Sequence, residues 1–114
     1  MWRNHDFKNI EKVPAESMRG GNGTIYLQKV IDVEKPVKMY AKITLPPMTS
    51  IGYHMHVGDQ EFIYVLKGEL DLVKDGAVSK LKAGEFDYTK ANFEHGITNN
   101  TSEDVEILAI VTEV

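Results

Sequence analysis

The sequence predicts an all-β fold in a single domain. Seven short segments are rich in Val, Ile, Tyr and Thr and are separated by Gly, Pro, Asn or Asp, which is typical of strands and turns. No stretch has the three- to four-residue apolar spacing of a long amphipathic helix. At 114 residues the chain is long enough for one hydrophobic core but short for two.

The expected strands follow one another along the chain. A glycine-rich segment, "MRGGNG", leads into the first of them, and an Asp-Gly pair at residues 75–76 predicts a tight hairpin turn. In the second, Met39, Ala41, Ile43 and Leu45 alternate with more polar residues, as in a half-buried strand. Many short strands at this spacing favour a sandwich or a barrel. The expected strands cover residues 23–31, 37–45, 61–68, 70–76, 84–90, 95–99 and 104–114.

The composition argues against several classes of partner. The net charge is −4, and Lys and Arg are scattered, which argues against nucleic acid or an anionic membrane as a partner. The N-terminal residues lack the apolar region of a signal peptide, and no apolar run approaches the roughly 18 residues of a membrane span. We therefore expect a cytoplasmic protein. The absence of cysteine excludes disulfides and thiolate chemistry.

Two of the four histidines lie close together. His54 and His56 are separated by one residue, and Glu61 follows five positions later. Alternate residues of a strand face the same side, and a sharp turn through residues 57–60 could bring Glu61 to that side as well. Two imidazoles and a carboxylate suit manganese, iron, nickel, copper or zinc. Two histidines alone are more often exposed or structurally hydrogen-bonded, so that alternative stays open.

The wider pattern resembles a known family. "GYHMHVGDQEFIYVLKG" at residues 52–68 and "GEFDYTKANFEHGITN" at residues 84–99 are similar to the two motifs of the cupin family. The resemblance implies a jelly-roll β-barrel, with residues 1–114 as one cupin domain, residues 1–22 as an N-terminal arm and both motifs within residues 46–99. It also implies that one divalent transition metal is held by four ligands, namely His54, His56, Glu61 and His95.

The chain departs from the family motifs at three turn positions. The glycine that usually opens the first motif is replaced by Met48, and the usual proline and glycine of the second motif are replaced by Lys90 and Asn92. Asn tolerates a left-handed backbone better than most residues, so Asn92 can stand in for that glycine. These departures change turn chemistry and leave all four expected ligands intact.

Strand parity gives candidates for residues around the metal. We expect Ile63, which shares the parity of Glu61, to face the interior, and Phe62 to pack on the other face or at a subunit contact. Phe86 and Tyr88 share a face that could line the cavity, while Asp87 and Thr89 share the other. No catalytic acid or base can be named. The candidates for the pocket and for contacts behind the ligands are Tyr53, Asp59, Gln60, Ile63, Phe86 and Tyr88.

Two classes of function follow from the resemblance. One is a metal-dependent enzyme of the dioxygenase, decarboxylase or isomerase type, acting on a small carboxylate, keto or sugar-like substrate. The chain looks most like small single-domain cupins related to the oxalate-decarboxylase branch. The alternative is a non-catalytic module that binds a small molecule or the metal itself. In both cases the expected partner is a small-molecule ligand.

A homodimer is also expected. The terminal segment "VEILAIVTEV" is apolar and would be an aggregation hazard at a free sheet edge. A C2 contact formed by sheet edges, with the N-terminal segment that carries Trp2 and Phe7, would protect it.

Overall fold

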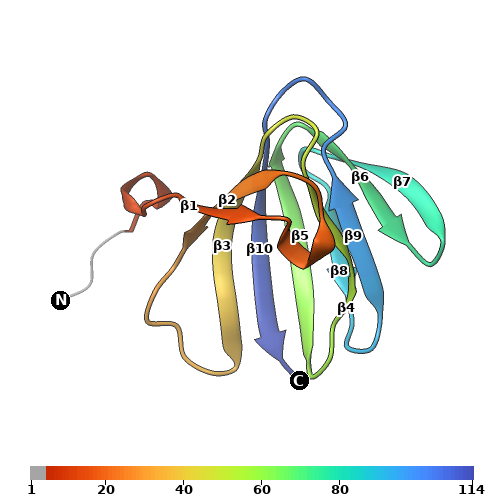
Figure 1. The fold of residues 1–114 in the computed structure, drawn as a ribbon. Coiled ribbons are helices and arrows are strands. Elements are labelled where there is room, and N and C mark those ends of the chain that lie inside the picture. Colours follow the sequence, from red (N-terminus) through yellow and green to blue (C-terminus); the bar gives the residue numbers. More distant parts are fainter. Residues whose placement is uncertain (1–4) are drawn as a thin grey trace.

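The computed structural model describes residues 5–114 and confirms the all-β prediction. The strands form two antiparallel sheets that pack face to face (Figure 1). No α-helix occurs in the described part of the chain, which has two short 3-10 turns, η1 (Phe7–Asn9) and η2 (Met18–Gly20). None of its helical segments is long and apolar enough to cross a membrane.

The larger sheet has six strands and the smaller has four. The order in the larger sheet is β1 (Val13–Glu16), β2 (Thr24–Lys29), β3 (Val37–Leu45), β10 (Val105–Glu113), β5 (Asp59–Lys67) and β8 (Phe86–Thr89). The order in the smaller sheet is β4 (Ser50–Met55), β9 (Glu94–Thr98), β6 (Glu69–Lys74) and β7 (Ala77–Lys82).

Each of the seven expected segments contains a strand, β4 is the strand on which the argument for His54 relied, and β1 and β7 are additional. Strand β1 has only four residues and includes Pro14, which an edge strand tolerates because one side of it has no partner. Strand β7 is also an edge strand, and Leu81 is its one buried residue. Because neither strand alternates between buried and exposed residues, the sequence pattern does not reveal them.

The turns adopt the backbone that their residues favour. Asp75 and Gly76 have φ of 51° and 74° and close a β6–β7 hairpin, as the Asp-Gly pair predicts. Asn92 has φ of 72° and does replace the glycine of the second family motif. Met48 also adopts a left-handed conformation, with φ of 63°, so this turn keeps the shape that a glycine would permit more readily.

The core lies between the two sheets. Its residues come from the inward rows of both sheets, and the largest fully buried apolar side chains include Ile43, Leu45, Leu70, Ile97 and Ile107. On β5, Ile63 and Val65 are buried, whereas Phe62 and Tyr64 are 42% and 41% exposed. The predicted parity of β5 is therefore confirmed.

The C-terminal strand does not lie at an edge. Strand β10 pairs with β3 on one side and β5 on the other, so its backbone is covered within the chain itself (Figure 1). The argument for a homodimer from a free apolar edge is therefore wrong. The homodimer itself stays a prediction. Of the two N-terminal residues expected at its contact, Trp2 lies outside the described residues, and Phe7 packs edge-on against Tyr40 with ring centroids 5.4 Å apart.

The central position of β10 predicts a large difference between two isoleucines of that strand. Ile107 is fully buried, whereas Ile110 is 37% exposed on the outer face. We expect Ile107→Ala to lower the free energy of unfolding by about 2–5 kcal/mol, because it removes buried methyl groups and leaves a cavity. The matched change Ile110→Ala should cost about 1 kcal/mol or less. Urea unfolding of both variants measures this, and similar losses would contradict the assigned core.

Candidate metal centre

Three histidines converge between the sheets, at the end where β10 finishes and β5 begins. His54 on β4 lies directly across from His95 on β9, and His56 follows the last residue of β4. The three pairs of ring centroids lie 4.9–5.0 Å apart. His56 and His95 are buried and His54 is half-buried. Two neighbouring strands therefore supply three imidazoles to one point.

Glu61 completes the cluster from the opposite sheet. The turn through residues 57–60 reverses the chain at Gly58, which has φ of 73°, and β5 then carries Glu61 back towards the histidines. Its Oε1 atom lies 3.1 Å from His56 Nε2 and 3.0 Å from His95 Nε2. One potential ligand atom from each of the four expected residues lies within 4.8 Å of the other three. The structure thus brings together all four residues that the family resemblance implies.

The other nitrogen of each ring faces outward and is anchored. His54 Nδ1 lies 2.7 Å from the Gly52 carbonyl, and His56 Nδ1 lies 2.8 Å from Asp59 Oδ1. His95 Nδ1 lies 2.9 Å from Asp87 Oδ2 and 2.9 Å from Thr89 Oγ1. Each acceptor favours a proton on Nδ1, which leaves the Nε2 lone pair available in the neutral ring. This is the usual arrangement behind metal-ligating histidines.

The spacing of the inner atoms fits a metal ion. His56 Nε2, His95 Nε2 and Glu61 Oε1 lie 3.0–3.1 Å from one another. Neighbouring ligands about 2.1 Å from one octahedral ion are about 3.0 Å apart. Three imidazoles and one carboxylate would leave two positions of such an ion open. The donor set suits manganese, iron, nickel or zinc.

Hydrogen bonds outweigh burial in setting the protonation of the cluster. Burial opposes the charging of His95, but its hydrogen bonds to Asp87 and Glu61 raise the pKa of His95 to about 9. Burial would raise the pKa of Asp87, yet hydrogen bonds from His95, Lys74 and Thr89 lower it to about 2. The metal-free site therefore holds a proton on His95 at neutral pH, and a metal must displace it.

The remaining cluster residues divide into two groups. Burial lowers the pKa of His54, and the nearby charges of His95 and Arg19 act in the same direction. The hydrogen bond to Glu61 raises the pKa of His56 in spite of burial. Burial would raise the pKa of Glu61, but hydrogen bonds from His56 and His95 lower it below its usual range. His54 is therefore the ring most ready to bind a cation at neutral pH.

The structure reverses the expected orientation of β8. Phe86 is 62% exposed, and Tyr88 stacks on Phe62 on the outer face, with ring centroids 4.5 Å apart. Asp87 and Thr89 are the buried residues of this strand. The expectation that Phe86 and Tyr88 line the cavity was based on their apolar rings alone. Thr89 pairs with Glu61 and Asp87 pairs with Ile63. Because Glu61 and Ile63 face inward, their cross-strand partners Thr89 and Asp87 must face inward too.

The remaining pocket candidates also divide between the two faces. Asp59 and Ile63 line the cavity, as expected. Tyr53 is 47% exposed on the other side of β4. Gln60 faces outward, where it accepts a hydrogen bond from the Tyr88 hydroxyl and donates one to Thr112. Asp59 and Ile63 therefore lie near the candidate ligands, whereas Tyr53 and Gln60 lie away from them.

Sequence reasoning missed two lysines, one lining the cavity and one behind the cluster. Lys38 Nζ lies 2.7 Å from Asp59 Oδ2, and Lys74 Nζ lies 2.7 Å from Asp87 Oδ1. Simple alternation along β3 places Lys38 on the outer face. A β-bulge opposite residues 111–112 of β10 leaves Lys38 unpaired, and this irregularity directs it to the cavity.

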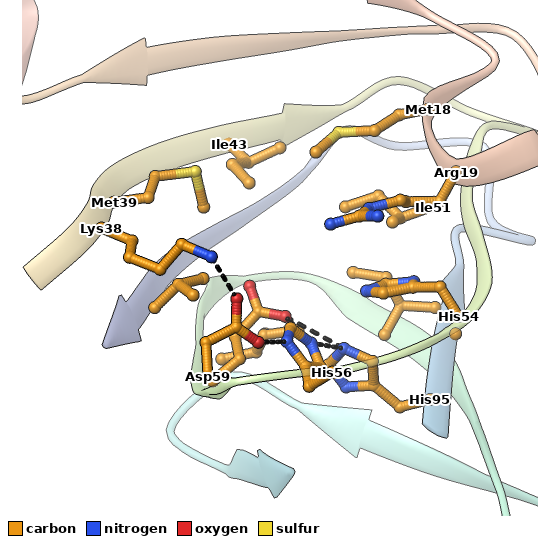
Figure 2. A pocket seen from close by; sticks show the side chains of 15 residues that line it. Met18, Arg19, Lys38, Met39, Ile43, Ile51, His54, His56, Asp59 and His95 are labelled. Atoms are coloured by element: carbon orange, nitrogen blue, oxygen red, sulfur yellow. Dashed lines mark hydrogen bonds and ion pairs between the residues drawn. The ribbon is translucent and has the colours of Figure 1, made fainter. Parts of the chain in front are cut away.

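The cluster opens into a small cavity of about 190 Å³. The upper wall is apolar, and Figure 2 shows Met18, Met39, Ile43 and Ile51 above the histidines. Arg19 of η2 also lines the cavity, so the N-terminal segment contributes to the site. This volume is below the roughly 300–1,000 Å³ of most ligand pockets, so the cavity suits a small ligand.

Comparisons with known proteins agree with this geometry. The model of the cupin domain family matches residues 41–111. A relative from Thermotoga maritima named oxalate-binding protein is 33% identical over 98 residues, which cover 83% of this chain and 81% of the relative. A crystal structure from Thermotoga maritima, described as a predicted oxalate decarboxylase, is 29% identical with a TM-score of 0.90, and the match covers 96% of this chain and 97% of that chain.

A more distant structure is similar in fold alone. A sugar phosphate isomerase from a cupin superfamily, from Silicibacter pomeroyi, has a TM-score of 0.82 at 20% identity. The match covers 98% of this chain and 76% of that chain.

The raised pKa of His95 predicts how the metal-free protein responds to pH. Folding favours protonated His95, so its contribution to stability is full below about pH 6.5 and is lost as the pH rises through about 9. We expect chelator-treated protein to lose on the order of 2–3 kcal/mol of unfolding free energy across this range. Asp87→Asn should weaken this dependence, whereas Asp75→Asn in the exposed β6–β7 turn should preserve it. Urea unfolding at a series of pH values tests this, and equal slopes for wild type and Asp87→Asn would refute it.

Proposed function

Because the chain belongs to the cupin family, we propose that it binds one divalent transition-metal ion through His54, His56, Glu61 and His95 and uses that site to hold a small carboxylate. The observation that carries the proposal is the anchoring of all three Nδ1 atoms by acceptors outside the cluster. This arrangement leaves the Nε2 atoms of the three rings available as ligands, and one potential ligand atom from each of the four residues lies within 4.8 Å of the other three. The jelly-roll fold of cupins is the framework that we infer for it.

The bound ion would supply a Lewis acid with open positions for an oxygen ligand. The chain's own residues perform the other tasks. Asp59 and Asp87 hold the rings of His56 and His95 in place, and Lys38 and Lys74 neutralise those two carboxylates. The apolar walls above the histidines limit the water in the cavity and strengthen electrostatic contacts inside it.

A small carboxylate is the ligand class that the observations favour. The relative from Thermotoga maritima is named for binding oxalate. The cavity of about 190 Å³ is small for a sugar phosphate and suits an acid of a few heavy atoms. Carboxylate oxygens are also ligands that manganese, iron and zinc accept readily.

Binding without turnover is favoured over catalysis. Proton transfer needs a group that is free to gain or lose a proton close to the reacting atom. Both oxygens of Asp59 are already engaged, by Lys38 and by His56, and Glu61 lies between two histidines. An enzyme of the decarboxylase, dioxygenase or isomerase type remains the alternative function, and it would need its acid or base from the ligand or from bound water.

The first prediction from this function concerns metal content. Protein purified without a histidine tag or chelator should contain about one equivalent of a transition metal per chain. The double variant His54→Ala, His56→Ala should lose it, because it removes two of the four ligands. His5→Ala, which removes an exposed histidine, is the matched control and should retain the metal. Elemental analysis decides the point, and absence of metal from wild-type protein even after incubation with manganese, iron, nickel and zinc would overturn the proposal.

The second prediction concerns the ligand. Metal-loaded protein should bind oxalate in a calorimetric titration, and chelator-treated protein should bind it at least about tenfold more weakly, because carboxylate oxygens occupy the open metal positions. Mixtures of loaded protein and oxalate, followed by NMR under air and under nitrogen, should show no loss of oxalate. Sustained turnover in such a mixture would instead establish the enzymatic alternative.

A further inference from the structure

The cavity contains a cation that the metal site does not use. Figure 2 shows the Arg19 side chain extending from η2 above His54, with its guanidinium group directed into the cavity. Among residues 5–114, no carboxylate lies within ion-pair distance of this guanidinium. Arg19 is therefore available to a ligand.

The other cation of the cavity is already neutralised. The Lys38 ammonium lies 2.7 Å from Asp59. Behind the cluster, Lys74 and Asp87 form a second pair at the same distance. Within the described part of the chain, Glu61 is thus the one carboxylate among Asp59, Glu61 and Asp87 that has no lysine partner. Arg19 is the one cationic side chain among the described residues lining the cavity that has no carboxylate partner.

This distribution of charge defines the ligand. A divalent ion carries two positive charges, Glu61 removes one and Arg19 adds one, so the loaded cavity has a net charge of about +2. A monoanion would leave half of that charge uncompensated. A small dianion would neutralise it completely, with one negative group at the metal and the other at Arg19.

The backbone holds Arg19 in a strained position. Its φ is 54°, and the adjacent Gly20 and the nearby Ser17 also have positive φ. Such a conformation is unfavourable for an arginine, and residues of this kind are concentrated at binding sites. Such strain persists only where contacts with neighbouring residues hold the backbone in place.

Two glycines allow η2 to lie directly on β4. A Cβ atom on Gly52 would clash with the Arg19 carbonyl oxygen, and one on Gly21 would clash with the Ser50 carbonyl oxygen. Asn22 adds hydrogen bonds from its backbone N–H to Ser50 Oγ and from its side chain to the Met48 carbonyl. The backbone that carries Arg19 is therefore in close, fixed contact with the strand that carries His54.

We propose that Arg19 recognises the second carboxylate of a small dicarboxylate whose first carboxylate lies at the metal, and that it makes the site select a dianion over a monoanion of the same shape. The inference deepens the proposed function and rests on it. A guanidinium group offers two parallel N–H donors to a carboxylate, which supplies both charge and orientation. Lysine at this position would supply the charge without the paired geometry.

Oxalate and oxamate provide the test, because they have nearly the same shape and differ by one negative charge. Calorimetric titration of manganese-loaded wild-type protein should show oxalate binding about 10- to 100-fold more tightly than oxamate. Arg19→Gln should weaken oxalate binding by about the same factor and oxamate binding by about threefold or less, because only the dianion has a second charge to lose. Arg19→Lys should recover part of the oxalate affinity and little of the selectivity.

Two controls separate recognition from structure. Lys67→Gln removes one exposed positive charge at the far end of β5 and should leave both affinities unchanged within about twofold. The unfolding midpoint of Arg19→Gln should equal that of wild type, and its manganese affinity should not fall, since Arg19 is not one of the candidate ligands and its positive charge repels the ion.

The outcomes distinguish failure of this inference from failure of the proposed function. If loaded wild-type protein binds oxalate and Arg19→Gln keeps its affinity and selectivity, the role of Arg19 is overturned and the proposed function stands. A parallel loss of manganese and oxalate affinity in Arg19→Gln would also overturn it, because Arg19 would then support the metal site. If loaded wild-type protein binds neither oxalate nor oxamate, the carboxylate function fails and this inference fails with it.

Discussion

The buried carboxylates Asp59, Glu61 and Asp87 impose the constraint on which the rest of the site depends. A carboxylate removed from water is strongly unfavourable unless it is paired and hydrogen-bonded. Here each one is satisfied by an imidazole, and Asp59 and Asp87 also have a lysine. The pairing determines which nitrogen of His56 and His95 carries a proton, and so which nitrogen faces the centre. Replacing such a network by apolar side chains often leaves a protein equally stable, so its presence is better explained by a function that needs ordered lone pairs.

The same strands supply the site at one end and the core at the other. On β5 the inward row changes from Glu61 to Ile63 and Val65 within five residues, and its neighbour β8 has Asp87 and Thr89 facing inward beside it. Because strand pairing holds these positions in register, the polar cluster is attached directly to a close-packed apolar core. A core of this kind has low compressibility, and the four donor atoms are therefore preorganised for a cation.

Local patterns predicted most of the strands and the four converging residues, whereas long-range pairing decided the rest. The alternation around Ile43 and the Asp75–Gly76 pair are local signals, and the structure confirms both. His54, His56, Glu61 and His95 were found because their spacing matches a family motif. Asp87 was assigned to the wrong face because two aromatic residues suggested the opposite orientation, and only the pairing of β8 with β5 decides this. The orientation of the Lys38 side chain towards the cavity depends on a β-bulge, and no local sequence signal predicts that bulge. The interior position of β10 depends on topology, so its apolar sequence was misinterpreted as that of an exposed edge.

The candidate metal site and the proposed recognition residue come from different parts of the chain. The four candidate ligands lie within residues 54–95, on or directly next to strands that are paired to the core, whereas Arg19 belongs to η2, which precedes the first long strand. The two parts meet at the contact of Gly21 and Gly52 with the opposing backbone. A substitution in η2 can therefore change the charge and shape of the cavity mouth without disturbing the imidazoles. This separation gives a physical reason why proteins with one metal-binding framework can take different ligands, because the framework holds the ion and a neighbouring segment selects what binds to it.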